Sequence, residues 1–309
     1  QVARLVRNPY YWNQPYPCLD EVDLMVVGDP ATQALQLQAG QIDVAEELPP
    51  DQLAALRNAP GVNIQVYPSL AEELIRLQRV KQPAFADANV RKAMNFALDK
   101  QAIASTVFFG TAKEQDSEMP RTLYYAPQTP YTYDVDKAKA LMAQSAFPNG
   151  FTTQLMIASN DPVESGIATV VKDELGKIGI TVNVQQVEAG TKLQLRSSRS
   201  FEMFLASTSA DQTDPESFWE FCCAAGFGLG SAWTDYNNPD VISQFAEVKK
   251  TGGDKRGQLF AQMQKEVWDD AAQLYLVFID APMGLRSNVK GFVLPPTRHH
   301  YFDTVYKTN

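Results

Sequence analysis

Strand and helix patterns alternate along almost the whole chain of 309 residues, and this alternation limits the folds open to it. In the clearest stretch, residues 154–158 read as a strand and residues 163–178 carry apolar side chains at helical spacing. Residues 180–185 then alternate between apolar and polar side chains, as a second strand does. This order favours a parallel sheet covered by helices, so the sequence predicts an α/β fold. At roughly 100–200 residues per domain, two domains are expected.

Further elements are predicted on both sides of this stretch. Asp29, Asp87 and Asp134 each stand where a helical pattern begins, and an aspartate there can accept hydrogen bonds from the first backbone amides. Gly40 is predicted to end the first of these helices. Other strands are expected at residues 22–27, 42–45, 62–66, 74–78, 201–206 and 274–279, other helices at 51–57, 214–221, 241–250 and 255–271, and a loop at 110–130.

Charge and hydropathy exclude two classes of partner. The chain has 27 Lys and Arg against 36 Asp and Glu, and 27 − 36 gives a net charge of −9. Such an acidic balance argues against binding to a phosphate backbone, which requires a basic face. No apolar run approaches the roughly 18 residues of a membrane-spanning helix, and the longest covers residues 274–279. We therefore expect no nucleic-acid partner and no membrane span.

Histidine and cysteine are too scarce for most imidazole or thiolate chemistry. The only histidines are His299 and His300, so a catalytic triad would have to use one of them. The cysteines, Cys18, Cys222 and Cys223, have neither the number nor the spacing of a zinc site or a disulfide framework. We expect no metal and no cofactor.

Two carboxylates follow the predicted strand at residues 201–206. Open α/β sheets bind their ligands at the carboxyl ends of parallel strands, where Asp211 and Asp214 are expected to lie. Asp214 precedes a proline at the start of a predicted helix, so helix capping accounts for it. Asp211 has no such local explanation and is a candidate ligand contact.

Other polar and aromatic residues are candidates near the same edge. Thr208, Ser209 and Asn160 offer short side chains that can form hydrogen bonds to a ligand, although loop polarity also accounts for them. Trp233 and Tyr236 could line a binding cleft, because ligand sites are mostly apolar, or they could pack in a core.

Two further motifs favour structural interpretations. Gly226, Gly228 and Gly230 form a GxGxG pattern, but no strand-to-helix context surrounds it, so a loop is favoured over a dinucleotide site. The adjacent acids Glu72 and Glu73 are typical of a solvent-exposed face. Neither motif is expected to bind a ligand.

Six segments in a fixed order cover nearly the whole chain. They are VRNPYYW at residues 6–12 followed by LDEV at 19–22, QLQAGQID at 36–43, FADANVRKAMNFALDK at 85–100, YDVDKAKAL at 133–141, DQTDPE at 211–216 and WTDYNNPD at 233–240. Together they resemble the dipeptide- and oligopeptide-binding branch of the extracellular solute-binding proteins of ABC transporters.

The resemblance implies a two-lobed Venus flytrap of the type II periplasmic-binding-protein class. Such a protein binds a peptide or similar small solute between its lobes and delivers it to the permease subunits of an ABC importer. It implies a non-enzymatic protein, exported to the periplasm or the cell surface, and we expect a monomer. Residues 75–275 would form the complete second lobe. Residues 1–74 with 276–309 would form the remainder of the first lobe, whose N-terminal part this chain is expected to lack.

The resemblance also assigns a role to Asp211. In peptide-binding relatives, the residue matching Asp211 holds the α-ammonium group of the ligand through a charge-assisted hydrogen bond. The same pattern often places an arginine in the stretch matching residues 158–161, where it clamps the ligand carboxylate. Here that stretch reads ASND, which argues against a free dipeptide. The alternative is a hydrolase or transferase that uses Asp211 and Asp214 as paired carboxylates.

Overall fold

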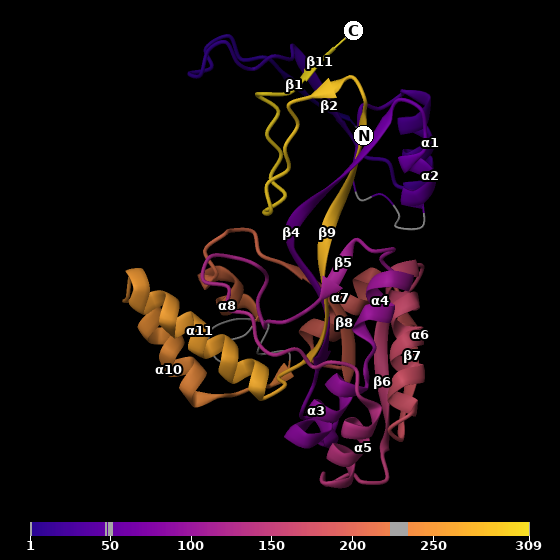
Figure 1. Ribbon diagram of the computed structural model, residues 1–309, viewed down its shortest axis with the longest axis vertical. Helices are drawn as coiled ribbons and strands as arrows, with labels where there is room; N and C mark the ends of the chain where they lie inside the picture. The colour runs from indigo at the N-terminus through magenta and orange to yellow at the C-terminus, as the bar shows by residue number, and fades with distance from the viewer. Residues whose placement is uncertain (1, 47, 49–51, 223–233, 309) are drawn as a thin grey trace. The chain divides into compact units, whose positions relative to one another are not determined.

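The computed structural model describes residues 2–46, 48, 52–222 and 234–308 (Figure 1). The chain divides into two compact units, unit 1 with residues 1–69 and 280–309, and unit 2 with residues 70–279. Two long strands, β4 (Val62–Leu77) and β9 (Leu274–Arg286), each contribute to both units. Residues that lie outside the description include Trp233, Cys223, the side chain of Cys222 and the three glycines at 226, 228 and 230.

The strand–helix–strand prediction is confirmed in unit 2. Strand β6 (Phe151–Ala158) pairs in parallel with β7 (Ile180–Val187) along its whole length, and α6 (Pro162–Gly176) connects the two. On its other side β6 pairs in parallel with β8 (Met203–Ser209). The α/β fold class is therefore confirmed.

Three further pairs in the sheet are antiparallel, which the sequence did not indicate. They are β4 with β8, β5 (Ala112–Glu114) with β9 and β3 (Val44–Ala45) with β9. Strand β8 pairs with the second half of β4, from Ala71 opposite Ser209 to Leu77 opposite Met203. Strand β5 lies within the stretch predicted to be loop. That prediction was wrong for these three residues because their partner strand lies far along the chain, so no local pattern marks the pairing.

The described residues of unit 2 include two large hydrophobic cores. In the larger core, residues of β6, β7 and β8 pack against α3 (Ala88–Ala97), α4 (Lys100–Thr106), α5 (Val135–Ala143) and α6 (Figure 1). The smaller core joins α8 (Glu216–Cys222), α10 (Pro239–Val248) and α11 (Gly253–Asp269). Helix α7 (Ala189–Ser197) was not predicted, because it has no fully buried residue and so carries no clear apolar stripe. A short 3-10 helix, η2 (Pro83–Ala86), precedes α3.

Unit 1 is built from short pieces. Strands β1 (Val2–Val6) and β2 (Glu21–Met25) form an antiparallel pair, and β10 (Val289–Lys290) and β11 (Tyr306–Lys307) form another. Strand β3 (Val44–Ala45) pairs with the last part of β9. Helices α1 (Pro30–Ala39) and α2 (Leu53–Arg57) complete the unit. The sequence predicted all but β1, β10 and β11.

The predicted helix caps are confirmed. The carboxylates of Asp29, Asp87 and Asp134 accept hydrogen bonds from the backbone amides of Thr32, Asn89 and Lys137. Gly40 ends α1 in the left-handed conformation, with φ of 71°, which glycine adopts without steric cost. These caps depend only on neighbouring residues, which is why the sequence reveals them.

The described tryptophans lie in contrasting surroundings. Trp12 in unit 1 is 82% exposed, whereas Trp219 and Trp268 in unit 2 are 0% and 3% exposed. Trp219 lies in the smaller core. The ring of Trp268 stacks on that of Tyr275 with centroids 4.2 Å apart.

Candidate functional site

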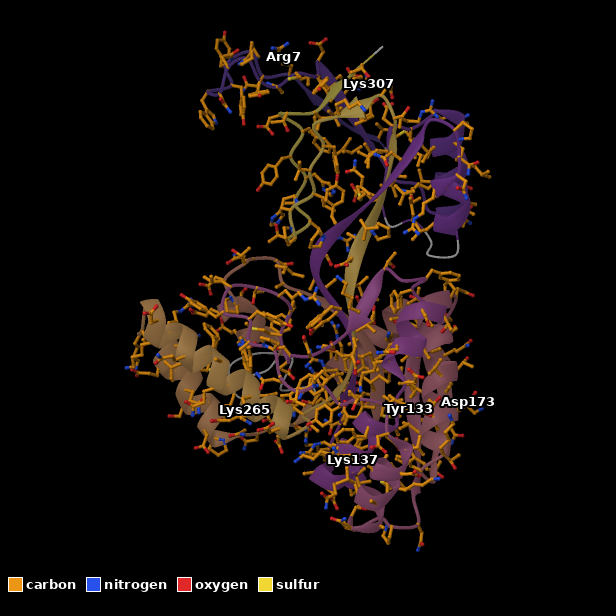
Figure 2. All side chains as sticks on the ribbon, in the orientation of Figure 1. Arg7, Tyr133, Lys137, Asp173, Lys265 and Lys307 are labelled. Carbon is orange, nitrogen blue, oxygen red and sulfur yellow. The ribbon has the colours of Figure 1, made fainter. Side chains whose placement is uncertain are left out.

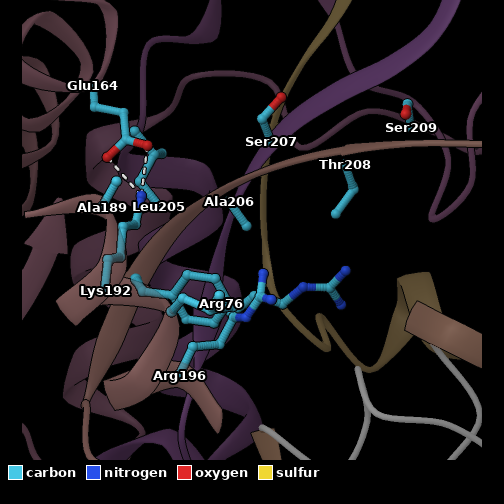
Figure 3. Close-up of a pocket in the computed structure, with 12 residues that line it drawn as sticks. Arg76, Glu164, Ala189, Lys192, Arg196, Leu205, Ala206, Ser207, Thr208 and Ser209 are labelled. Carbon is cyan, nitrogen blue, oxygen red and sulfur yellow. Dashed lines mark hydrogen bonds and ion pairs between the residues drawn. The ribbon is translucent and has the colours of Figure 1, made fainter. Parts of the chain in front are cut away.

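A cavity of about 420 Å³ lies in unit 2 at the end of strand β8 (Figure 3). Residues 204–209 of β8 form one wall. Charged side chains enter from three other elements, namely Arg76 from β4, Glu164 from α6, and Lys192 and Arg196 from α7. The cavity therefore combines an apolar base with several charged groups, as small-molecule sites do.

Two of the predicted site residues line this cavity. Thr208 donates a hydrogen bond from Oγ1 to Oε1 of Glu72 at 3.0 Å. Ser209 is exposed and lies opposite Ala71 in the β4–β8 ladder. Both residues follow a buried stretch of strand, and a ligand contact by either of them stays a prediction.

The other predicted residues do not line the cavity. Asn160 is exposed just beyond β6, with φ of 62°, and is followed by Asp161, which caps α6. Asp211 is exposed two residues after β8 and forms no hydrogen bond or ion pair with any other described residue. Tyr236 is 6% exposed in the smaller core, beneath the guanidinium of Arg79 at 4.9 Å. Trp233 lies outside the described residues.

The carboxylate of Asp214 is held by groups of α8 and α11. Its Oδ1 accepts a hydrogen bond from the backbone amide of Glu216 at 2.9 Å, at the start of α8. Arg256 on α11 binds the same carboxylate through two nitrogens, at 2.6 and 3.0 Å. These hydrogen bonds from Arg256 lower the pKa of Asp214. The carboxylate thus ties α8 to α11.

Replacing Asp214 with alanine is expected to lower the free energy of unfolding at neutral pH by about 0.5–2 kcal/mol, as the loss of a helix cap does. Because Arg256 lowers the folded-state pKa of Asp214, the contribution is present above the unfolded pKa and is lost as the pH falls through the folded pKa. Urea unfolding at pH 7 and pH 3 tests this. The gap between wild type and Asp214→Ala should narrow at the lower pH, and an equal gap at both values would contradict the assignment.

Glu72 and Glu73 are buried, so the prediction of a solvent-exposed face was wrong. Glu72 is 0% exposed, and its Oε2 accepts a hydrogen bond from Nε2 of Gln115 at 2.9 Å. Burial, and then the nearby charge of Glu118, raise the pKa of Glu72 well above its usual range. Burial raises the pKa of Glu73 to about 8. The physical reason is that β4 continues through Leu77 and every residue from 69 onward is buried.

The two arginines of the cavity were not selected from the sequence. Arg76 is 3% exposed, and Arg196 is partly exposed on α7. A charged residue inside the apolar run of β4 was the one signal for Arg76. Lys192, also on α7, contacts Glu164 at 2.5 and 2.6 Å. Within the described residues, no group of three or more His, Cys, Asp and Glu is placed to hold a metal ion.

Comparison with known proteins gives a consistent assignment. The family model described as "Bacterial extracellular solute-binding proteins, family 5 Middle" matches residues 1–227. The chain is 30% identical over 304 residues to the probable D,D-dipeptide-binding periplasmic protein DdpA of Escherichia coli, covering 97% of this chain and 58% of DdpA. It is 26% identical over 307 residues to the glutathione-binding protein GsiB of Salmonella choleraesuis, covering 95% and 59%.

A solved structure supports the same relationship. The periplasmic binding protein DppA from Helicobacter pylori, in complex with the peptide STSA, has a TM-score of 0.83 and 26% identity. The match covers 98% of this chain and 60% of DppA, so the chain spans about three-fifths of each of these relatives. The fold is that of the type II periplasmic binding proteins.

The relatives are named as binding proteins rather than enzymes, and Asp214 is held by Arg256, so the paired-carboxylate alternative is set aside. None of the described helices has the length and apolar character needed to cross a membrane. The match to the family model covers well over half of the chain. The chain belongs to the bacterial extracellular solute-binding proteins, family 5.

Proposed function

We propose that the whole protein is the solute-binding component of an ABC importer. It captures a peptide or similar small solute and delivers it to the membrane permease, acting as an exported monomer in the periplasm or at the cell surface. The observation that carries the proposal is the family match over residues 1–227. The names of the relatives mention a D,D-dipeptide and glutathione, and DppA was solved with the peptide STSA, which favours a peptide-like solute.

In this proposal the chain contributes to two lobes. Residues 75–275 form the second lobe, and residues 1–74 with 276–309 belong to the first. Ligand contacts from both lobes would favour a closed form, and the permease would recognise that form. The compact units 1–69 with 280–309 and 70–279 are close to this division.

We also propose that Asp211 anchors a cationic or hydrogen-bond-donating group of the solute. Support comes from its exposed carboxylate, which has no hydrogen bond or ion pair with another described residue, and from its place just beyond β8. A hydrogen bond to a charged group contributes roughly 1.5–3 kcal/mol. Loss of that contact corresponds to a roughly 10- to 150-fold weaker affinity.

Calorimetry on the full-length protein tests both parts of the proposal. The probes are alanyl-alanine, glutathione and the peptide STSA, with maltose as a non-peptide comparison. We expect at least one peptide to bind and Asp211→Ala to weaken that binding about 10- to 150-fold.

The matched control removes the same charge elsewhere. Asp173 is exposed on α6, and Asp173→Ala should leave the affinity unchanged (Figure 2). If Asp211→Ala binds the peptide with unchanged affinity, the anchoring role of Asp211 is disproved, whereas the proposal of peptide binding still holds. Binding of maltose alone would instead exclude a peptide-like solute.

A further inference from the structure

Strands β1 and β2 form a sheet of two strands in unit 1 (Figure 1). Among the described strands, they pair only with each other. A sheet of two strands is at best marginally stable in water, because it buries little apolar surface. Further strands or a covering layer stabilise such a sheet, and the side chains on its two faces indicate where a covering layer fits.

The register of the pair places only apolar side chains on one of its faces. Residues directly opposite one another in an antiparallel pair project from the same face. Ala3 lies opposite Leu24. Leu5 lies opposite Val22, two residues further along each strand, and this pair therefore shares that face. We call these four side chains the apolar face.

The opposite face carries charged side chains that pair with one another. Arg4 donates two hydrogen bonds to the carboxylate of Asp23, both at 2.8 Å. Its Nε also lies 3.2 Å from Oε1 of Glu21. This mixed face is completed by three apolar side chains, Val2, Val6 and Met25. Covering the mixed face would remove three charged groups from water, which costs free energy that the ion pairs return only in part.

The apolar face is open to solvent in this chain. Leu5 is 48% exposed and Leu24 is 43% exposed. In unit 2, by contrast, Leu155 and Ile157 of β6 are fully buried. Exposed leucines that are grouped on one face, rather than scattered, indicate a surface that another part of a protein covers.

A groove of about 280 Å³ adjoins the apolar face. Leu5 and Val22 line it from that face, Leu19 and Phe302 line it from neighbouring segments, and its other lining residues include charged ones. Leu19 and Phe302 also pack against a hydrophobic core of unit 1. An apolar side chain placed in the groove would therefore contact both the sheet and residues of this core.

We propose that another part of the whole protein packs its own apolar side chains on the apolar face, while the mixed face stays in water. The match covers 58% of DdpA and 60% of DppA, so about two-fifths of each relative has no counterpart in this chain. A segment of the same polypeptide is always present at high effective concentration. A second copy, by contrast, carries the same net charge of −9 and is repelled.

Two neighbouring residues on opposite faces provide a matched test. In this chain Leu24 is 43% and Met25 is 45% exposed, so glutamine at either position would have a similar effect if neither face were covered. In the full-length protein, Leu24→Gln should lower the melting temperature by about 3 °C or more, because it buries an amide without a partner. Met25→Gln should lower it by less than about 1 °C. Equal shifts would overturn the proposal.

Hydroxyl-radical labelling of the unaltered full-length protein provides a second measurement that requires no variant to fold. Mass spectrometry gives the oxidation rate of each side chain, and a synthetic peptide of residues 19–28 gives the rate for the solvated side chain. Leu24 should react at least about 10-fold more slowly in the protein than in the peptide. Met25 should react within about 3-fold of the peptide, because it stays exposed. Similar protection of both residues, or of neither, would overturn the proposal.

Sedimentation identifies the other candidate occupants. Labelling is carried out at a concentration at which the protein sediments as a monomer. Protection of Leu24 only at concentrations where dimers form would assign the apolar face to a second copy, and protection only after addition of permease-containing vesicles would assign it to the permease. Either result would overturn the proposal, as would a natural protein no longer than this chain. None of these measurements depends on solute binding, so they stand apart from the test of the proposed function.

Discussion

Replacing Arg91 with glutamine is expected to lower the free energy of unfolding by about 3–5 kcal/mol, the cost of breaking a buried charged network. Arg91 is 3% exposed. Its guanidinium donates to the backbone carbonyls of Phe85, Ala86, Asp270 and Ala271 at 2.7–3.1 Å, and to Oδ1 of Asp270 at 2.9 Å. Without these donors, carbonyls at a largely buried position lose their hydrogen-bond partners.

Urea unfolding at neutral pH measures this change. Lys92 is the neighbouring cation and is only partly buried, so Lys92→Gln should change the stability by less than about 0.5 kcal/mol. A loss below about 1 kcal/mol for Arg91→Gln would show that water or a rearranged backbone replaces the guanidinium.

Glu73 should make the folded protein less stable as the pH rises. Burial raises its folded-state pKa to about 8, above the value of 4.5 for a solvated glutamate. A raised carboxyl pKa favours the folded state below the unfolded pKa, and this advantage is lost as the pH rises through the folded pKa. Wild type should therefore lose about 3–5 kcal/mol relative to Glu73→Gln between pH 4.5 and pH 9.

Chemical unfolding of both proteins across that range tests the sign. The variant keeps the size and the hydrogen-bonding capacity of the side chain but cannot ionise, so the difference isolates the charge. Glu188→Gln, at an exposed position before α7, should follow the wild-type curve. A constant difference between wild type and Glu73→Gln at all pH values would falsify the raised pKa.

The fold was predictable wherever the deciding contacts are local. Asp87 and Asp134 cap helices through amides two and three residues away, and residues 151–187 show their periodicity directly. Burial of Glu72 was not predictable, because its hydrogen-bond partners Gln115 and Thr208 lie 43 and 136 positions away. Without knowledge of those partners, an acidic side chain in a strand is interpreted as solvent-exposed.

The residues of the candidate site were likewise predictable only in part. Thr208 and Ser209 were selected by their place at the end of a strand, and they line the cavity. Arg196 was missed because α7 has no fully buried residue and no side-chain cap that marks it in the sequence. Asp211 was selected through the family resemblance, and its role stays a proposal for the binding experiment to decide.

The contrasting environments of the tryptophans make the two units optically distinguishable. An indole in water emits at longer wavelength than one in an apolar core, and a soluble quencher such as iodide reaches only the former. Trp12 should therefore be quenched selectively, whereas Trp219 and Trp268 should retain their emission. In a Trp12→Phe variant every described indole belongs to unit 2, so its blue-shifted fluorescence would follow the unfolding of that unit without an added label.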